Sequence, residues 1–289
     1  MKKLLAMAVT AAFTVSMLAG CGQSAETTDA SAQETETEAA GEETADTADA
    51  ASEDTAERTT FTVGFDAEFP PYGYMDESGE YTGFDLELAQ EVCDRNGWEL
   101  VKQPIDWDSK DMELSSGAID CIWNGFTMNG REDAYTFSVP YVDNSQVFVV
   151  AADSGITAFD DLAGKNVGVQ KDSSALAALE GDAADLAATF GNLTQYSDYN
   201  TAFMDLEQGA IDALAIDVGV ADYQIASRGE GFVKLSENLA SEQYGIGFKL
   251  GNVELKDQVE KTLLEMADDG TFGKIAEKYG LSDSVCLGK

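Results

Sequence analysis

Apolar residues beyond residue 60 fall into short continuous runs that alternate with stretches of helical spacing. In the first part of this region the runs predict strands at residues 61–65, 98–103 and 119–123. Apolar residues three and four positions apart predict helices at residues 85–96 and 109–116. A regular alternation of strand and helix is typical of an α/β layer with mostly parallel strands.

The same alternation starts again further along the chain. Predicted strands lie at residues 146–151, 166–169, 194–196 and 213–216 and within 241–252. Predicted helices lie at residues 174–179, 200–207, 253–268 and 272–279, with a single helical turn at 160–164. The chain is therefore expected to form two α/β blocks.

One short segment occurs in both blocks. Residues 115–125 read SSGAIDCIWNG, and residues 207–217 read EQGAIDALAID. In each copy the pattern predicts a helix that ends at a glycine, because glycine tolerates the left-handed conformation that closes many helices. An apolar strand follows. The repeat favours two related halves, although chance similarity of a common helix–glycine–strand pattern is the alternative.

The residues that follow the two repeated strands are candidates for a binding site. Ligands of open α/β sheets bind beyond the carboxyl ends of the strands. Asn124, Gly125, Thr127 and Arg131 follow the strand of the first copy, and Asp217 follows the strand of the second. A guanidinium grips a carboxylate through two hydrogen bonds, and a carboxylate pairs with an ammonium group. The two blocks together therefore fit the two charged ends of an α-amino acid.

Both charged residues also have a structural interpretation. Arg131 is followed by Glu132 and Asp133, so it could form a surface ion pair instead. Asp217 could cap a following helix. The spacing of the residues leaves these alternatives open.

Charge and composition exclude several classes of function. The chain of 289 residues has a formal net charge of −37 and a pI of about 4.1, so nucleic-acid binding is not expected. It contains no histidine, which excludes a histidine-dependent catalytic triad and a histidine-ligated zinc site. No Cys-x-x-Cys spacing occurs. We therefore predict neither a metal site nor a cofactor.

The N-terminal 60 residues differ from the rest of the chain. Two lysines precede the apolar run 4–18, which ends in LAGC at residues 18–21 and resembles a bacterial lipobox. This resemblance implies a lipoprotein signal peptide at residues 1–20 and lipidation of Cys21; an ordinary signal peptide is the alternative. Residues 21–60 carry 12 of the 54 acidic residues and few apolar ones, which predicts a disordered acidic tether.

Three further cysteines, Cys93, Cys121 and Cys286, cannot all pair with one another. Cys93 falls in a predicted helix and Cys121 in a predicted buried strand, where a thiol packs as a small apolar group. All three are predicted to be free thiols.

Four longer segments resemble family-3 solute-binding proteins, the polar amino-acid-binding components of ABC importers. They are VGFDAEFPPYGYMDESGEYTGFDLELAQEV, GFTMNGREDAYTFSVPYVDNSQVFVV, DLAGKNVGVQKDSSA and ADDGTFGKIAEKYG. They follow the family order across about residues 61–280. The resemblance implies a two-lobed periplasmic-binding-protein-like fold of type II, in which each lobe is a mostly parallel sheet flanked by helices.

The resemblance also implies how the chain is divided. One lobe would hold residues 61–150 and 243–289, and the other residues 151–242, with crossings near residues 149–152 and 241–245. The lobes would close around the ligand by a hinge motion. The partners implied are a small amino acid, the ABC permease and, through the lipid, the outer face of the cell membrane, as in a Gram-positive cell. The protein would be a monomer and not an enzyme.

The resemblance carries over ten ligand-binding residues. They are Asp66, Phe69, Asn124, Gly125, Thr127, Arg131, Gln170, Ser173, Ser174 and Asp217. By analogy with the family, Gly125, Thr127 and Arg131 bind the ligand carboxylate, with donors added by the serine pair at a helix N-terminus. Asp217 binds the ammonium group, Phe69 stacks on the ligand, and Asp66 and Gln170 face its side chain.

Three departures from the family pattern stand out. The loop before Arg131 is one residue shorter than usual, and Asp172 replaces the usual glycine before the serine pair. An anion at residue 172 would weaken a carboxylate site unless it faces away. Glu99 stands near the place of the second cysteine of disulfide-bonded relatives, which favours a free Cys93.

Two other functions are compatible with the same sequence. Some relatives are dehydratases that act on prephenate-like or arogenate-like acids, and Asp66 or Glu68 would then supply the acid or base. A sensor domain is the third reading. Tyr72, Tyr74, Trp107 and Trp123 could contact ligand or pack in the interior. Asp66 favours a polar or cationic ligand such as glutamine, histidine, arginine, lysine or cystine.

Overall fold

The computed structural model describes residues 58–288 of the chain. The predicted signal peptide, the lipidation site Cys21 and most of the predicted tether therefore lie outside the described residues. The predicted tether extends to residue 60, but β1 begins at Thr60 and Arg58 already forms an ion pair with Asp120 at 2.8 Å. The folded region therefore begins slightly earlier than the sequence indicates.

The first lobe is built on a five-stranded sheet with the order β5-β1-β6-β14-β7. These strands are β1 (Thr60–Phe65), β5 (Glu99–Pro104), β6 (Cys121–Ile122), β7 (Tyr135–Phe137) and β14 (Gly247–Lys249). The strand β1 runs parallel to β5 and β6, whereas β14 is antiparallel to β6 and β7. A small sheet joins β2 (Glu68–Phe69), β3 (Gly73–Met75) and β4 (Tyr81–Thr82).

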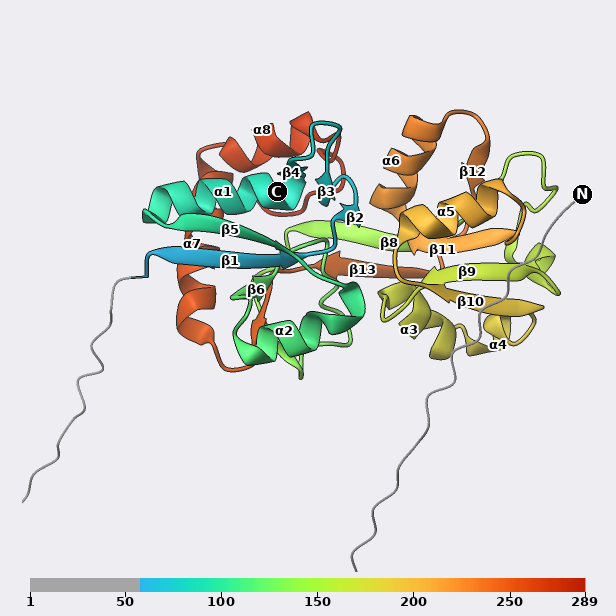
Figure 1. Cartoon of the computed structure of the whole chain (residues 1–289), viewed down its shortest axis with the longest axis horizontal. Coiled ribbons are helices and arrows are strands. Elements are labelled where there is room, and N and C mark those ends of the chain that lie inside the picture. The colour runs from blue at the N-terminus through green and yellow to red at the C-terminus, as the bar shows by residue number, and fades with distance from the viewer. Residues whose placement is uncertain (1–57, 289) are drawn as a thin grey trace, which may run out of the picture. The chain divides into compact units, whose positions relative to one another are not determined.

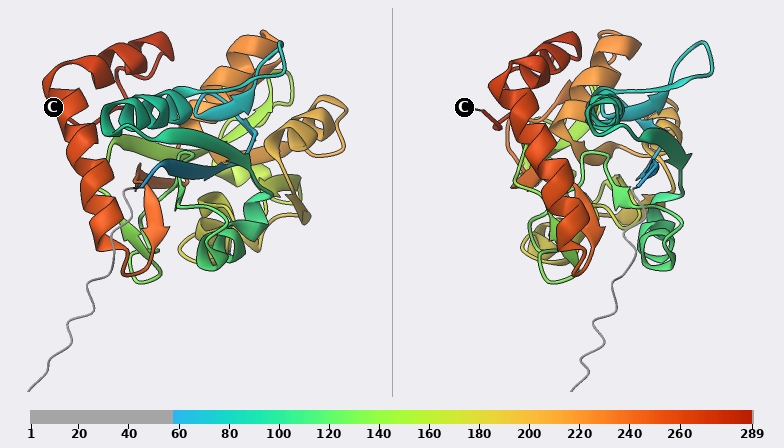
Figure 2. Two further views of the ribbon diagram at one scale, coloured as in Figure 1. Left: turned by 60° about the vertical axis from the view of Figure 1, so that its left-hand side comes forward. Right: turned by 90° about the vertical axis from the view of Figure 1, so that its left-hand side faces the viewer.

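Helices cover both faces of this sheet (Figure 1). They are α1 (Phe84–Asn96), α2 (Lys110–Ser116), α7 (Val253–Asp268) and α8 (Thr271–Lys278), with a 3-10 turn at Trp107–Ser109 before α2. Alternate residues of β1, such as Phe61 and Val63, share a core with α1, α7 and α8, which pack against one another (Figure 2). The opposite face, at Ile122, packs with α2 residue Leu114.

The second lobe has a sheet with the order β10-β9-β11-β8-β12, to which β13 is added through β8. The strands are β8 (Val142–Ala151), β9 (Asn166–Gln170), β10 (Asn192–Tyr196), β11 (Ala213–Asp217), β12 (Phe232–Lys234) and β13 (Ala240–Tyr244). The helices are α3 (Ser174–Glu180), α4 (Ala184–Ala187), α5 (Tyr199–Glu207) and α6 (Val218–Arg228), with a 3-10 turn at Phe159–Leu162.

The strand β11 shows why this sheet is covered on both faces. Leu214 and Ile216 pack with α5 and α6, whereas Ala213 and Ala215 pack in a separate core with α3. A strand buried on both faces appears in the sequence as a continuous apolar run. The sequence predicted this run, but α6, α4 and β12 were not predicted.

The chain passes between the lobes twice, and β8 and β13 run between them in Figure 1. The two strands are antiparallel, with Gln146 opposite Ala240 and Val142 opposite Tyr244. The strand β8 pairs with β13 from Val142 onward and with the second-lobe strand β11 from Gln146 onward. The predicted crossings near residues 149–152 and 241–245 stay predictions. Polar residues 143–145 had concealed the first part of β8. The predicted single strand in 241–252 is divided between β13 and β14, which belong to different sheets.

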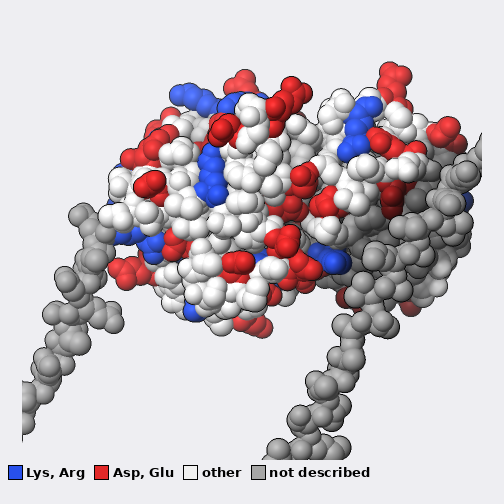
Figure 3. Space-filling model, viewed as in Figure 1, with Lys and Arg blue, Asp and Glu red and all other residues white. Residues whose placement is uncertain are grey.

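Acidic side chains are spread widely over the face in Figure 3, and basic ones are fewer. Within residues 58–288, no helix is both long and apolar enough to span a membrane. The same residues contain no group of three or more histidine, cysteine, aspartate or glutamate side chains arranged to hold a metal ion. Cys93 and Cys121 are buried free thiols, as predicted.

Candidate functional site

The two Gly-Ala-Ile-Asp segments form the same local structure. Gly117 and Gly209 follow α2 and α5 with φ of 80° and 72°, the left-handed region that favours glycine. The next N–H turns back to the helix in both copies: Ala118 donates to Glu113 O at 3.0 Å, and Ala210 donates to Asp205 O at 2.8 Å. Each helix therefore ends in the same way before its strand begins.

The aspartates of the two segments also have equivalent roles. A carboxylate oxygen of Asp120 accepts from Thr62 N at 2.7 Å, and one of Asp212 accepts from Asn166 N at 2.8 Å. Each aspartate thereby holds the first residues of the neighbouring parallel strand, β1 or β9. The carboxyl ends of β6 and β11 are thus directed toward the space between the lobes.

Eight of the ten predicted site residues line one small cavity between the lobes. They are Phe69, Gly125, Thr127, Arg131, Gln170, Ser173, Ser174 and Asp217, and Trp107 joins them. The cavity has a volume of about 10 Å³, which corresponds to about one water molecule. The lobes are therefore closed on one another, and residues far apart in the sequence meet at one place.

Asp217 is 4 % exposed and accepts several hydrogen bonds. Its Oδ1 accepts from Tyr244 Oη at 2.6 Å, from Gln146 Nε2 at 2.6 Å and from Asn144 Nδ2 at 2.9 Å. Asp217 occupies the N-cap position of α6, but its side chain makes no capping bond. The capping alternative is therefore wrong. Burial, followed by the charge of neighbouring Glu242, raises the pKa of Asp217 to about 7.

Arg131 lines the same cavity as Asp217. Its Nη1 donates to Thr127 O at 3.0 Å and its Nη2 donates across the cleft to Asp172 O at 3.3 Å. The guanidinium also lies over the Phe126 ring, 5.0 Å from its centre. These contacts, rather than an ion pair with Glu132 or Asp133, fix its position, so the shorter loop still brings Arg131 to the cleft.

The carboxylate of Asp172 does not face the cavity as a free anion. It pairs with Lys110 Nζ of the other lobe, and the Lys110 side chain is only 2 % exposed. Asp172 has φ 54°, the only non-glycine residue among those described with a positive φ. Pairing with a buried ammonium explains how an aspartate is accommodated next to the predicted carboxylate site.

The hydroxyl groups near the cavity are already hydrogen-bonded in the closed form. Ser173 Oγ accepts from Leu176 N at 3.1 Å, so Ser173 is the N-cap of α3, and it donates to Gln170 O at 2.8 Å. Thr127 Oγ1 lies 3.3 Å from Ser174 Oγ across the cleft. The roles of these three residues as ligand donors stay predictions, and a ligand would have to exchange bonds with Thr127 and Ser174.

The backbone N–H of Gly125 also has a hydrogen-bond partner within the protein. It donates to Asp85 Oδ2 at 2.6 Å, and Tyr141 Oη donates to the same oxygen at 2.9 Å. Asp85 is fully buried, and this burial raises the pKa of its carboxyl to about 7. Gly125 has φ 56°, and an added Cβ would approach a Phe69 ring carbon to 2.8 Å. Glycine is therefore required for both the conformation and the space.

Asp66 and Asn124, the two predicted residues that do not line the small cavity, lie beside it. Gln170 Nε2 donates across the cleft to Asp66 Oδ2 at 2.7 Å, and Glu68 N donates to Asp66 Oδ1 at 2.8 Å. Burial raises the pKa of Asp66 to about 6. Asn124 Oδ1 accepts from Asp66 N at 3.1 Å, so Asn124 positions Asp66 from behind.

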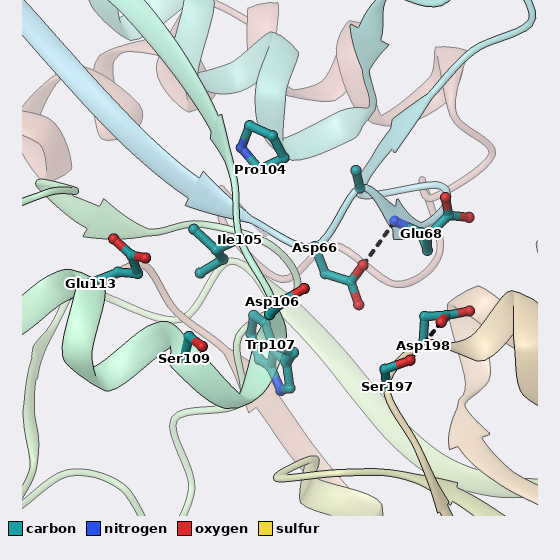
Figure 4. Close-up of a pocket in the computed structure, with 11 residues that line it drawn as sticks. Asp66, Glu68, Pro104, Ile105, Asp106, Trp107, Ser109, Glu113, Ser197 and Asp198 are labelled. Carbon is teal, nitrogen blue, oxygen red and sulfur yellow. Dashed lines mark hydrogen bonds between the residues drawn. The ribbon is translucent and has the colours of Figure 1, made fainter. Parts of the chain in front are cut away.

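Asp66 also lines a larger pocket of about 430 Å³, shown in Figure 4. Five carboxylates line this pocket, from Asp66, Glu68, Asp106, Glu113 and Asp198, and no lysine or arginine does. Trp107 lines both this pocket and the small cavity, so the two spaces adjoin. The space next to Asp66 is therefore suited to a positively charged group.

Aromatic rings close the cleft from both sides. Phe69 lies 5.9 Å from Tyr199, and Tyr72 lies 5.2 Å from Tyr244, measured between ring centres. Trp123 is fully buried and lines neither space, so it is a core residue.

Sequence patterns missed several polar residues around Asp217. Glu242 on β13 and the amides of Asn144 and Gln146 on β8 form its immediate surroundings. They stand in consecutive polar residues, 143–146 of β8 and 241–243 of β13, which carry no periodic strand signal. Which of those positions face the cleft depends on the pairing of β8 with β13.

Two α/β lobes joined by two strands, with charged groups meeting between them, define the class of two-lobed solute-binding proteins. The chain belongs to the bacterial extracellular solute-binding proteins, family 3, which its residues 61–282 match. This family membership and the α/β fold of type II were both predicted from the sequence and are confirmed.

Individual relatives carry names that specify ligands. The L-cystine-binding protein TcyJ of Escherichia coli (strain K12) is 30 % identical over 226 residues, which cover 77 % of this chain and 83 % of the relative. The arginine-binding extracellular protein ArtP of Bacillus subtilis (strain 168) is 29 % identical, covering 75 % of this chain and 84 % of the relative.

Solved structures show the same fold. An ABC uptake transporter substrate-binding protein from Streptococcus pneumoniae with bound histidine matches with a TM-score of 0.75 and 34 % identity, covering 78 % of this chain and 94 % of the other. The ancestral amino acid-binding protein AncCDT-1, a precursor of cyclohexadienyl dehydratase, matches with a TM-score of 0.70 and 28 % identity, covering 76 % of this chain and 95 % of the other.

Proposed function

We propose that the protein captures a cationic or polar L-amino acid between its lobes and delivers it to the permease of an ABC importer. It would do so as a monomer, outside the cytoplasm, anchored by a lipid on Cys21. The ligand carboxylate would lie against Arg131, Thr127 and Ser174, and its ammonium group against Asp217. The side chain would pass Asp66 toward the larger pocket.

One observation supports the cationic preference. The buried carboxylates of Asp66, Asp217 and Glu242 lie around the cleft, and five carboxylates line the adjoining pocket. Two basic side chains contact Asp172: Arg131 donates to its carbonyl oxygen, and Lys110 pairs with its carboxylate. A ligand that carries a second positive charge offsets this excess of negative charge, whereas glutamate would add to it.

Calorimetry with the twenty amino acids and cystine tests the ligand class. We expect micromolar or tighter binding of arginine, lysine, histidine or cystine and no binding of glutamate. Asp66→Asn should weaken the preferred ligand more than it weakens glutamine. If glutamate binds as well as the best cation, the cationic preference is wrong.

The head-group contacts are tested by Arg131→Ala and Asp217→Ala. Each change should weaken binding by more than about 100-fold, because it leaves a ligand charge without its partner in a closed site. Arg95→Ala and Asp257→Asn are controls, since both residues form ion pairs outside the cavity. Unchanged affinity in either cleft variant would show that the corresponding contact is assigned wrongly.

The dehydratase alternative has less support. The matching proteins are named for binding cystine, arginine and histidine, and AncCDT-1 is itself named as an amino acid-binding protein. Incubation with prephenate or arogenate should therefore give no turnover. Turnover without binding of any free amino acid would favour the enzyme instead.

A further inference from the structure

A second buried carboxylate lies beside Asp217. It belongs to Glu242 on β13, which is 8 % exposed. Thr127 Oγ1 donates to Glu242 Oε1 at 3.0 Å, so this carboxylate faces the cleft between the lobes. None of the sequence motifs includes Glu242, and its position follows only from the pairing of β13 with β8.

Two amide groups hold both carboxylates at once. Gln146 Nε2 donates to Asp217 Oδ1 at 2.6 Å and to Glu242 Oε1 at 2.8 Å. Asn144 Nδ2 donates to the same two oxygens, at 2.9 Å and 2.7 Å respectively. Two oxygens that lie 2.6 Å and 2.8 Å from the same nitrogen can be no more than about 5.4 Å apart.

The surroundings do not offset two negative charges at this separation. The phenols that face the pair are Tyr199 from α5, Tyr244 from β13 and Tyr72 from the first lobe, and burial raises the pKa of each well above 10. They therefore remain neutral. No ion pair to either carboxylate occurs within residues 58–288, and the guanidinium of Arg131 is directed to backbone carbonyls. Burial, followed by the charge of Glu242, raises the pKa of Asp217 to about 7, so Asp217 holds a proton in part of the molecules near neutral pH.

The same place has acceptors that lack donors. Asn144 Oδ1 and Gln146 Oε1 are buried and make no hydrogen bond within the described part of the chain. An unsatisfied buried acceptor is costly and calls for an explanation. An ammonium group has three N–H donors and a positive charge, which suits two carboxylates flanked by amide oxygens.

We propose that Asp217 and Glu242 together receive the α-ammonium group of the ligand, and that this group displaces the proton that Asp217 holds. This inference rests on the proposed function, which supplies a ligand with an ammonium group. The ligand keeps its three N–H bonds, and the carboxyl proton passes to solvent. Asp217 gains one negative charge as the ammonium adds one positive charge, so the site keeps its net charge.

Proton release on binding provides the test. The ligand found by calorimetry is titrated into the protein at pH 6 in two buffers with different heats of ionisation, which counts the protons released. We expect up to one proton per ligand at pH 6 and few at pH 8. The dissociation constant should rise by up to about 10-fold per pH unit below 7, since ligand and proton compete for Asp217.

Glu242→Gln separates this proposal from a role for Asp217 alone. The variant should bind about 10-fold more weakly at pH 8, release fewer protons at pH 6 and show a flatter pH profile between 6 and 8. Glu254→Gln, an exposed change on α7, is the matched control and should behave as wild type.

Three results would overturn the proposal. The first is the absence of proton release from the wild type at pH 6, which decides the question even if Glu242→Gln does not fold. The second is unchanged affinity and pH profile in the variant. The third is tighter binding by the variant, which would mean that Glu242 only occupies the place of the ligand carboxylate. Failure of the wild type to bind any amino acid at pH 8 would instead overturn the proposed function, and this proposal with it.

Discussion

Asp85 prepares the cleft from the interior of the first lobe. It is fully buried on α1, does not line the small cavity and fixes the N–H of Gly125, which does. The sequence marks it only as a polar residue at the start of a helix. Its burial depends on contacts with Gly125 and Tyr141, which are 40 and 56 residues away.

Asp85→Asn should change how stability depends on pH. Burial raises the pKa of Asp85 to about 7 in the folded protein, whereas the unfolded chain has a value of about 4. The contribution of protonated Asp85 to the free energy of unfolding is complete below about pH 4. It is lost as the pH rises from about 4 to 7, because Asp85 ionises there only in the unfolded chain. Asparagine cannot ionise, so the slope should flatten by up to about 1.4 kcal/mol per pH unit.

Urea unfolding at pH 4.5, 5.5, 6.5 and 7.5 measures this slope. Asp66 and Asp217 also have raised pKa values, so the variant should keep part of the dependence. Asp76→Asn is the control, because the pKa of this exposed carboxyl is lowered and it titrates below this range. Equal slopes in Asp85→Asn and wild type would contradict the burial argument.

At the scale of elements, the repeated segment is a connection that turns a helix into a strand. The left-handed glycine and the apolar strand were both evident in the sequence. The bonds of Asp120 and Asp212 to the neighbouring strand were not, because they depend on which strands lie side by side. The repeated sequence therefore specifies the turn from helix to strand. The order of strands in each sheet decides which backbone N–H the aspartate binds.

Gly117→Ala and Gly209→Ala should each lower the free energy of unfolding by about 1 kcal/mol, since alanine is strained at positive φ. An added Cβ would meet nothing within 4 Å at either residue, so only the backbone conformation is tested. Gly273→Ala is the matched control: it lies inside α8 at an ordinary φ with equal free space. It should be neutral or stabilising, and denaturant unfolding of the three variants compares them. Equal effects at all three positions would refute the left-handed requirement.

At the scale of the whole molecule, closure requires surfaces that fit. Gly219 in the first turn of α6 lies against Tyr72 of the other lobe, and an added Cβ would come within 2.4 Å of Tyr72 Oη. No such contact exists within the second lobe, and the glycine has an ordinary helical φ. Gly219→Ala therefore acts as a wedge against closure rather than as a folding defect.

Gly219→Ala should weaken ligand binding by about 10-fold or more, while the free energy of unfolding stays equal or rises by up to about 1 kcal/mol. Small-angle scattering should show a larger radius of gyration with ligand present than for wild type. The second-site change Tyr72→Phe removes the clashing oxygen and should restore part of the affinity. Wild-type affinity in Gly219→Ala would show that the closed arrangement is not the binding form.

The sequence by itself determined the features that neighbouring residues encode. Apolar spacing gave the α/β class and the central elements of both lobes, since side-chain periodicity reflects which face is buried. The quoted motifs indicated the family, and the ends of the repeated strands pointed to Arg131 and Asp217, which both line the small cavity. These features depend on residues that are close together along the chain.

Only the tertiary structure decided the contacts between distant residues. It paired Asp172 with Lys110, placed Glu242 beside Asp217 and committed Gly125 N–H to Asp85. Strand register and lobe closure bring these groups together. Burial then strengthens their interactions, because a carboxylate removed from water needs hydrogen-bond donors or a proton. No pattern along the chain records which polar residues will share such a place.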